Sequence, residues 1–188
     1  MGRDITVVRK ALMGCILLTL ILLPAGAVTL QGGGGFGGQY DLTHDTYQHV
    51  VILSGGVLLA LNAYWEVGAV LQGKTSYAAL INGGPEVLQG EQAGALQLKA
   101  GRKLISQNLF HFGAQAGLSF WYALYEHTEQ AFFYPEVELG PYLDLRLESH
   151  PFSIRAAVPI GFSLRGDGAH RINWRAETSL SIRLGGQR

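Results

Sequence analysis

The sequence predicts an all-β fold, an eight-stranded antiparallel up-and-down barrel. From Phe133 to Leu184, apolar and polar residues alternate with a period of two, which is the period of an extended strand. Short polar turns divide this stretch into three runs, so the strands follow one another without helices between them. Five further runs upstream bring the count to eight, an even number that a closed barrel accommodates.

The first five strands are predicted from composition and alternation. Residues 33–42 are glycine-rich at their start and end in a polar turn, and residues 50–62 are apolar on both faces. Residues 65–75, 93–103 and 110–125 alternate; in the last of these, Phe112 and Phe120 oppose His111 and Ser119. The spacing of Gly33, Gly35 and Gly38 fits a dinucleotide fingerprint, but no helix follows it. We therefore interpret these glycines as a crowded strand start.

Strands six to eight cover residues 133–147, 152–164 and 172–184. The connections after strands two, four and six are short. Those after strands one, three, five and seven are longer or more polar, above all residues 76–92. This order places both ends of the barrel on the short-turn side, which is the pattern of bacterial outer-membrane barrels. Closure also removes the two exposed edges that an open sheet would have.

The first 27 residues have the pattern of a signal peptide. Arg3, Arg9 and Lys10 precede an apolar run at 11–23, and small residues follow, so we expect cleavage after Ala27. An uncleaved anchor and lipidation of Cys15 are alternatives. The domain prediction is a signal peptide at 1–27 and a barrel at 28–188. Cleavage would leave a chain without cysteine and therefore without disulfides.

Charge and composition exclude several classes of function. The formal net charge is zero, which gives no basic surface for nucleic acid, and 48% hydrophobic residues are too many for a disordered chain. Histidines 44, 49, 127 and 170 are scattered through the longer connections, and we expect no metal site and no cofactor. Glu136 and Glu138 share one face, as paired catalytic carboxylates would, but no catalytic triad can be assigned. We expect no enzyme activity.

Composition indicates which face of the barrel points outward. The apolar faces are nearly free of charge at mid-strand, as a lipid-facing band requires, because a Lys or Arg there would cost about 2–4 kcal/mol. The polar faces would then line a lumen. The expected lumen ion-pair network consists of Glu66, Lys99, Glu136, Glu138, Asp144, Arg146, Arg155, Arg175, Glu177 and Arg183. The expected aromatic girdles contain Trp65, Phe120, Phe133, Phe152 and Trp174.

These features resemble a known group, the small outer-membrane β-barrels such as the outer-membrane protein W family and the transmembrane domain of outer-membrane protein A. The resemblance covers residues 32–184 and is architectural. It implies location in the outer membrane, contact with lipid and insertion by the barrel-assembly machinery. The chain departs from the group at its end, 183–188, where an aromatic residue that the machinery reads is missing.

Two mid-strand prolines suggest a weak point in the wall. Pro141 and Pro159 cannot donate ladder hydrogen bonds, although a barrel has no free edge for them. If residues 149–150 form a two-residue turn, Pro141 pairs with Val158, and Gly140 with Pro159. Each proline then removes one bond, one inside the hairpin and one to a flanking strand. One hypothesis is a lateral opening for small apolar solutes, as the resemblance to the protein W family implies; the alternative is a bulge without a transport role.

The sequence leaves several functions open. The first is a non-enzymatic outer-membrane barrel that either passes small hydrophobic solutes or contacts host-surface ligands through residues 76–92 and 126–131. A general porin is disfavoured, because side chains fill an eight-stranded interior. The alternative is a secreted, soluble, calycin-like binding barrel with its apolar face inside. A palmitate-transferring or deacylating barrel is the remaining possibility.

Overall fold

In a computed structural model, the described residues are 27–78, 91–125, 131–146, 150–164 and 170–184. They form nine strands: β1 (Val28–Asp41), β2 (Thr46–Ala60), β3 (Trp65–Ala78), β4 (Glu91–Ser106), β5 (Phe110–Tyr125), β6 (Ala131–Arg146), β7 (Phe152–Ala157), β8 (Ile160–Leu164) and β9 (His170–Leu184). No helix among these residues is long and apolar enough to span a bilayer. The signal-peptide prediction falls almost wholly on residues 1–26, which lie outside the described part.

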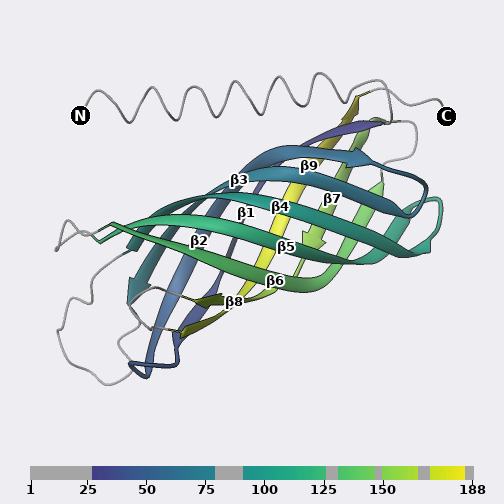
Figure 1. Cartoon of the computed structure of the whole chain (residues 1–188). Coiled ribbons are helices and arrows are strands. Elements are labelled where there is room, and N and C mark those ends of the chain that lie inside the picture. Colours follow the sequence, from purple (N-terminus) through teal and green to yellow (C-terminus); the bar gives the residue numbers. More distant parts are fainter. Residues whose placement is uncertain (1–26, 79–90, 126–130, 147–149, 165–169, 185–188) are drawn as a thin grey trace, which may run out of the picture.

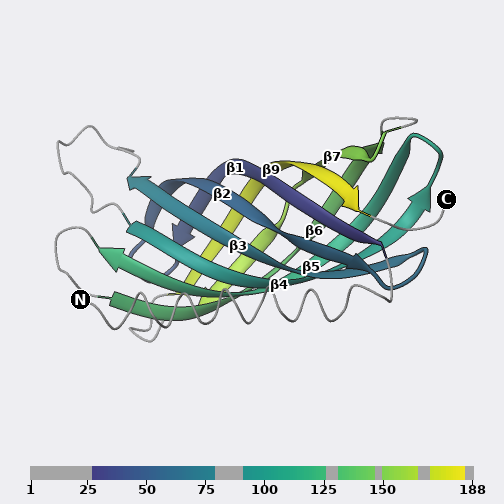
Figure 2. The same cartoon turned by 90° about the horizontal axis from the view of Figure 1, so that it is seen from above.

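Consecutive strands pair antiparallel from β1 through β7, both β7 and β8 pair with β9, and β1 pairs with β9 to close the sheet. β7 and β8 share one place between β6 and β9, so the nine strands fill eight positions. Figures 1 and 2 show the strands winding obliquely around one axis, with the start of β1 and the end of β9 at the same end. We call this the short-turn end and the opposite one the long-loop end. The predicted eight-stranded barrel is confirmed.

Strand bounds agree best where alternation is strict. The predicted fifth strand, 110–125, matches β5 at both ends. The first was predicted to start at Gly33, whereas β1 begins at Val28, because Val28 pairs with both Leu59 and Leu184. Pairing on two sides thus extends regular structure into residues that show no clear pattern of their own. The predicted long connection 76–92 loses residues to β3 and β4, and its remainder, 79–90, lies outside the described residues.

The apolar face points outward and the polar face points into the lumen. In β6, the side chains of Val137 and Leu139 are 61% and 63% exposed, whereas those of Glu136 and Glu138 are 1% and 3% exposed. The same alternation runs through β4, β7 and β8. Most of the buried polar residues are therefore lumen residues. A soluble barrel with its apolar face inside would have the reverse arrangement.

One part of the lumen is apolar. Trp121, Tyr134 and Ile52 are almost completely buried and pack together with Ala95 and Ala123. They come from strands β2, β4, β5 and β6. Trp121 follows Phe120 directly, so the alternation that turns Phe120 outward turns Trp121 inward. This cluster fills space near the long-loop end that a wide channel would leave open.

The glycine-rich middle of β1, which the sequence placed at a strand start, is crowded. A Cβ atom on Gly33 would lie 2.2 Å from the Thr178 carbonyl oxygen of β9, and one on Gly37 would lie 1.9 Å from that of Trp174. Both distances are far inside van der Waals contact. These glycines therefore let the backbones of β1 and β9 approach closely where the barrel closes, with no phosphate-binding role.

Candidate functional site

Buried ion pairs occupy the lumen at three levels. The upper level, nearest the long-loop end, is built around Glu91 of β4. Its carboxylate oxygens lie 3.1 Å from Lys74 Nζ and 2.6 Å from Arg171 Nη1, and the Tyr134 hydroxyl donates to it at 2.7 Å. Arg171 Nε also lies 3.3 Å from Asp41 Oδ2. Lys74 Nζ stands 4.6 Å from the centre of the Trp121 ring, within cation–π range, so the apolar cluster and the upper ion pairs form one packed unit.

The middle level is built around Arg175 of β9. Its Nη1 lies 2.9 Å from Glu136 Oε1, its Nε lies 2.9 Å from Glu177 Oε1, and its Nη2 pairs with Glu138. Each of the two β6 carboxylates also accepts from an amide side chain. Asn173 Nδ2 of β9 lies 2.7 Å from Glu136 Oε2, and the Gln97 amide of β4 donates to Glu138. One guanidinium thus bridges a cluster of three carboxylates and offsets part of the repulsion between them.

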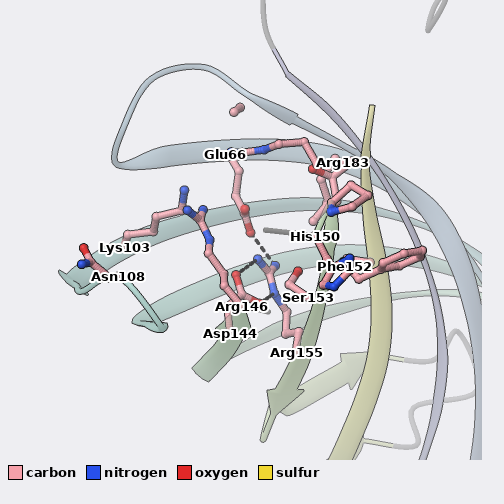
Figure 3. A pocket seen from close by; sticks show the side chains of 15 residues that line it. Glu66, Lys103, Asn108, Asp144, Arg146, His150, Phe152, Ser153, Arg155 and Arg183 are labelled. Carbon is pink, nitrogen blue, oxygen red and sulfur yellow. Dashed lines mark hydrogen bonds and ion pairs between the residues drawn. The ribbon is translucent and has the colours of Figure 1, made fainter. Parts of the chain in front are cut away.

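The lower level, nearest the short-turn end, is built around Arg155 of β7. Its Nε and Nη2 lie 2.6 and 2.7 Å from the two carboxylate oxygens of Asp144, a bidentate pair, and its Nη1 pairs with Glu66 of β3. The guanidinium also lies 4.2 Å from the Tyr142 ring centre. Figure 3 shows this side chain reaching Glu66 and Asp144.

Several of these contacts cross the full width of the barrel. β3 and β7 are four positions apart in a ring of eight, and so are β4 and β9. Arg155 with Glu66, and Arg171 with Glu91, therefore join opposite walls. Side chains that meet across the diameter leave no straight open path along the axis between them. The lumen chemistry favours a braced, filled interior over a wide pore.

Lumen glycines make room for these carboxylates. A Cβ atom on Gly101 would lie 2.7 Å from a Glu66 carboxylate oxygen, and one on Gly117 would lie 2.7 Å from Glu138 Oε1. Gly101 pairs with Glu66, and Gly117 with Glu138, on adjacent strands. Each glutamate side chain thus leans over the neighbouring strand, where a larger residue would displace it. The alternation of charge and glycine on the polar faces was a sequence signal for this arrangement.

The structure brings together most, but not all, of the residues expected in the lumen network. Lys99, Arg146 and Arg183 form no ion pair with another described residue. Lys99 is buried in the lumen, while Arg146 and Arg183 stand at the short-turn end, where few carboxylates reach them. The expected network omitted four residues that form the upper level: Asp41, Lys74, Glu91 and Arg171. Asp41 and Lys74 lie near the ends of predicted strands, whereas Glu91 falls in the predicted connection 76–92 and Arg171 just before the predicted eighth strand.

The two prolines remove ladder bonds where the sequence placed them. Tyr142 pairs with Ala157 and Leu139 with Ile160, so Pro141 stands opposite Val158 in the same register. Val158 N donates to Pro141 O at 3.1 Å and Arg175 N donates to Pro159 O at 3.1 Å, but neither proline can donate in return. The ladder is interrupted between Ala157 and Ile160, which splits the predicted seventh strand into β7 and β8.

The five residues expected in the girdles all point outward. Trp65 and Phe152 begin β3 and β7 at the short-turn end. Phe120, Phe133 and Trp174 lie nearer the long-loop end, and the rings of Phe120 and Phe133 stack with their centres 6.3 Å apart. Their placement in two bands is what an aromatic girdle on each side of a bilayer requires.

No group of three or more His, Cys, Asp or Glu side chains suited to a metal ion occurs in the described part of the chain. His127 lies outside that part. The backbone N–H of His44 donates to Asp41 Oδ1 at 3.1 Å, and His44 Nδ1 lies 3.3 Å from the same oxygen. His111 is buried in the lumen, and neither of its ring nitrogens has a hydrogen-bond partner among the described residues.

The barrel is similar to solved structures of small outer-membrane β-barrels. Neisserial surface protein A matches with a TM-score of 0.63 at 11% identity, over 85% of this chain and 99% of that one. The N-terminal β-barrel domain of Pseudomonas aeruginosa OprF matches with a TM-score of 0.54 at 12% identity, over 85% and 98%. Yersinia pestis Ail with the heparin analogue sucrose octasulfate matches with a TM-score of 0.52 at 13% identity, over 84% and 99%.

At these identities the similarity shows the fold alone: the chain has the eight-stranded antiparallel barrel fold of these outer-membrane proteins. No protein-family model matches its sequence, and no curated protein does.

Proposed function

We propose that this protein is an exported, integral outer-membrane barrel, without enzymatic activity or cofactor, that acts by contact at the cell surface. Its partners would be outer-membrane lipid, the barrel-assembly machinery and a host-surface ligand bound at the long-loop end. The observation that carries this proposal is the lumen, where ion pairs join opposite walls at two levels and a third ion-pair cluster lies between them.

The outer surface supports the membrane location. Large apolar side chains such as Leu53, Val137 and Leu139 are more than half exposed in mid-strand. A soluble monomer rarely exposes a continuous apolar belt of this kind, whereas a bilayer solvates it. The surface role draws on the longer connections, which emerge at one end. Because Ail binds a heparin analogue in its solved complex, a sulfated glycan is a suitable first ligand to test.

The filled lumen predicts that the barrel carries no steady ionic current. In planar lipid bilayers, the purified protein is expected to give no conductance steps above the bare membrane. A variant with Glu66, Asp144 and Arg155 all replaced by serine should be equally silent, because the middle and upper levels remain. Regular conductance steps from the unmodified protein would contradict the contact proposal and favour a channel.

The surface role is tested by binding. Cells that display the protein are expected to adhere to immobilised heparin, and replacing residues 79–90 and 126–130 by short Gly-Ser turns should abolish adhesion. The matched control keeps both connections at full length and replaces Arg102, which is exposed at the opposite end, by glutamine. Adhesion unchanged by the loop replacement, with the barrel still folded, would contradict the role assigned to these connections.

A second candidate function is passage of small apolar solutes through a lateral opening at the prolines. The interrupted ladder between β7 and β8 favours it. The charges beside it disfavour it, since the solute would meet Arg175 and its carboxylates on the lumen side.

Restoring the ladder separates the two functions. The double variant Pro141→Val, Pro159→Ser gains two backbone donors, so we expect its free energy of unfolding to rise by about 1–3 kcal/mol. Under the contact proposal, uptake of an apolar fluorescent dye into cells that carry the barrel stays unchanged. A marked fall in uptake, with the barrel folded and at equal abundance, would favour the lateral opening.

A further inference from the structure

A cavity of about 260 Å³ lies inside the short-turn end of the barrel, below the lower ion-pair level. Its walls include Lys103, Arg146, Arg155 and Arg183, together with the neutral polar side chains of Asn108 and Ser153. Figure 3 shows Lys103 and Arg146 on one side of the cavity, Arg183 and His150 on the other, and Arg155 between them.

The charges around this cavity are unbalanced. Among the lining residues that the structure describes, four are cationic and two, Glu66 and Asp144, are acidic, which leaves a net charge of +2 with His150 neutral. Arg155 already pairs with both carboxylates. Lys103, Arg146 and Arg183 form no ion pair with any described residue.

These three cations also repel one another. Lys103 experiences the positive charges of Arg146 and Arg183 together with the opposing negative charges of Glu66 and Asp144. Lys103 is buried, so water screens its charge poorly, whereas Arg146 is half-buried and Arg183 is exposed. Because both carboxylates already pair with Arg155, an anion that entered the cavity would reduce the remaining repulsion between the cations.

We propose that this cavity binds the phosphate group of a small phosphorylated molecule. A phosphate monoester carries a charge of about −1.5 to −2 at neutral pH, close to the opposite of the charge on the lining. Guanidinium groups match its oxygens with paired N–H donors, and a lysine adds a point charge. A simple monovalent anion would neutralise only half of the excess positive charge on the lining.

The size of the cavity limits the rest of the ligand. Pockets for drug-sized ligands measure about 300–1,000 Å³, so a cavity of about 260 Å³ takes a phosphate with a small organic body. The proposal stands independently of surface contact, because this site lies at the opposite end from the longer connections.

Inorganic phosphate is the first probe. Titrated into the full barrel refolded in neutral detergent at constant ionic strength, it is expected to bind saturably, as measured by calorimetry. Lys103→Gln and Arg146→Gln should each weaken binding about tenfold or more, because each removes a charge-assisted hydrogen bond. Arg102→Gln is the matched control, since Arg102 is exposed next to Lys103 and stacks on Trp65 with its guanidinium carbon 5.4 Å from the ring centre.

The absence of saturable binding, or an equal loss of phosphate affinity in the Arg102 and Lys103 variants, overturns the proposal.

A second measurement needs no variant. In nuclear magnetic resonance spectra of the unmodified barrel, phosphate should shift the backbone signals of residues that line the cavity and leave those around Glu91 unmoved. Shifts spread evenly over the barrel overturn it as well.

The phosphate group can come from a free metabolite or from a lipid headgroup. Glycerol 3-phosphate in solution and phosphatidic acid doped into the micelles are compared as competitors of inorganic phosphate. Competition by glycerol 3-phosphate alone identifies a soluble ligand, and competition by phosphatidic acid alone identifies a lipid. Either result supports the site. Competition by neither overturns it.

Discussion

Replacing Arg175 by methionine is expected to lower the free energy of unfolding by about 3–5 kcal/mol, the cost of leaving buried charge without its partner. Arg175 is 3% exposed and pairs with Glu136, Glu138 and Glu177. Methionine is of similar length and apolar, so the variant removes charge with little change in volume. Urea unfolding in detergent micelles, followed by heat-modifiable gel migration, measures the loss.

The physical reason is tested by a compensating variant. If unpaired carboxylates cause the loss, adding Glu136→Gln and Glu138→Gln to Arg175→Met should recover most of the stability. Arg102→Met, at an exposed site, should cost less than about 1 kcal/mol. Equal losses for Arg175→Met and Arg102→Met would show that the middle ion-pair level does not carry the stability we assign to it.

Replacing Leu139 by arginine is expected to lower the free energy of unfolding in lipid vesicles by about 2–4 kcal/mol. Leu139 lies in the middle of β6 and is 63% exposed, so the arginine would face acyl chains. In a soluble barrel the same side chain would enter water, and the substitution would be close to neutral. Urea unfolding of the protein inserted in vesicles distinguishes the two cases.

The matched control is Leu61→Arg. Leu61 is 60% exposed but lies in the turn between β2 and β3, outside the strands. Its replacement should change stability by less than about 1 kcal/mol, because the turn is near water. If Leu139→Arg were as mild as Leu61→Arg, the apolar outer face would not be in contact with hydrocarbon, and the membrane assignment would be withdrawn.

Much of the fold was predictable from the sequence. Alternation in β6 separated Glu136 and Glu138 from Val137 and Leu139, and the structure places the first pair in the lumen and the second outside. A strand is long enough to average out local exceptions, and one face must be uniform to meet one solvent. The assumption of a short turn before residue 152 also gave the register that sets Pro141 opposite Val158.

The strand ends were less predictable. The start of β1 at Val28 depends on its two neighbours, and the break between β7 and β8 depends on which residues Pro159 faces. Both are decided by hydrogen bonds to other strands. A short polar or glycine-rich segment carries little information about such partners, because its own pattern is compatible with loop or strand.

By itself, the sequence determined which side chains share a face, since a period of two is a property of the extended backbone, and it determined which face suits lipid, since charge is excluded there. Only the tertiary structure decided which charges meet. Arg155 and Glu66 are 89 residues apart, and Arg171 and Glu91 are 80 apart. They meet because closure of the sheet places their strands on opposite walls and strand register brings them to one height. The same geometry leaves Lys103, Arg146 and Arg183 together at one end without an ion-pair partner among the described residues.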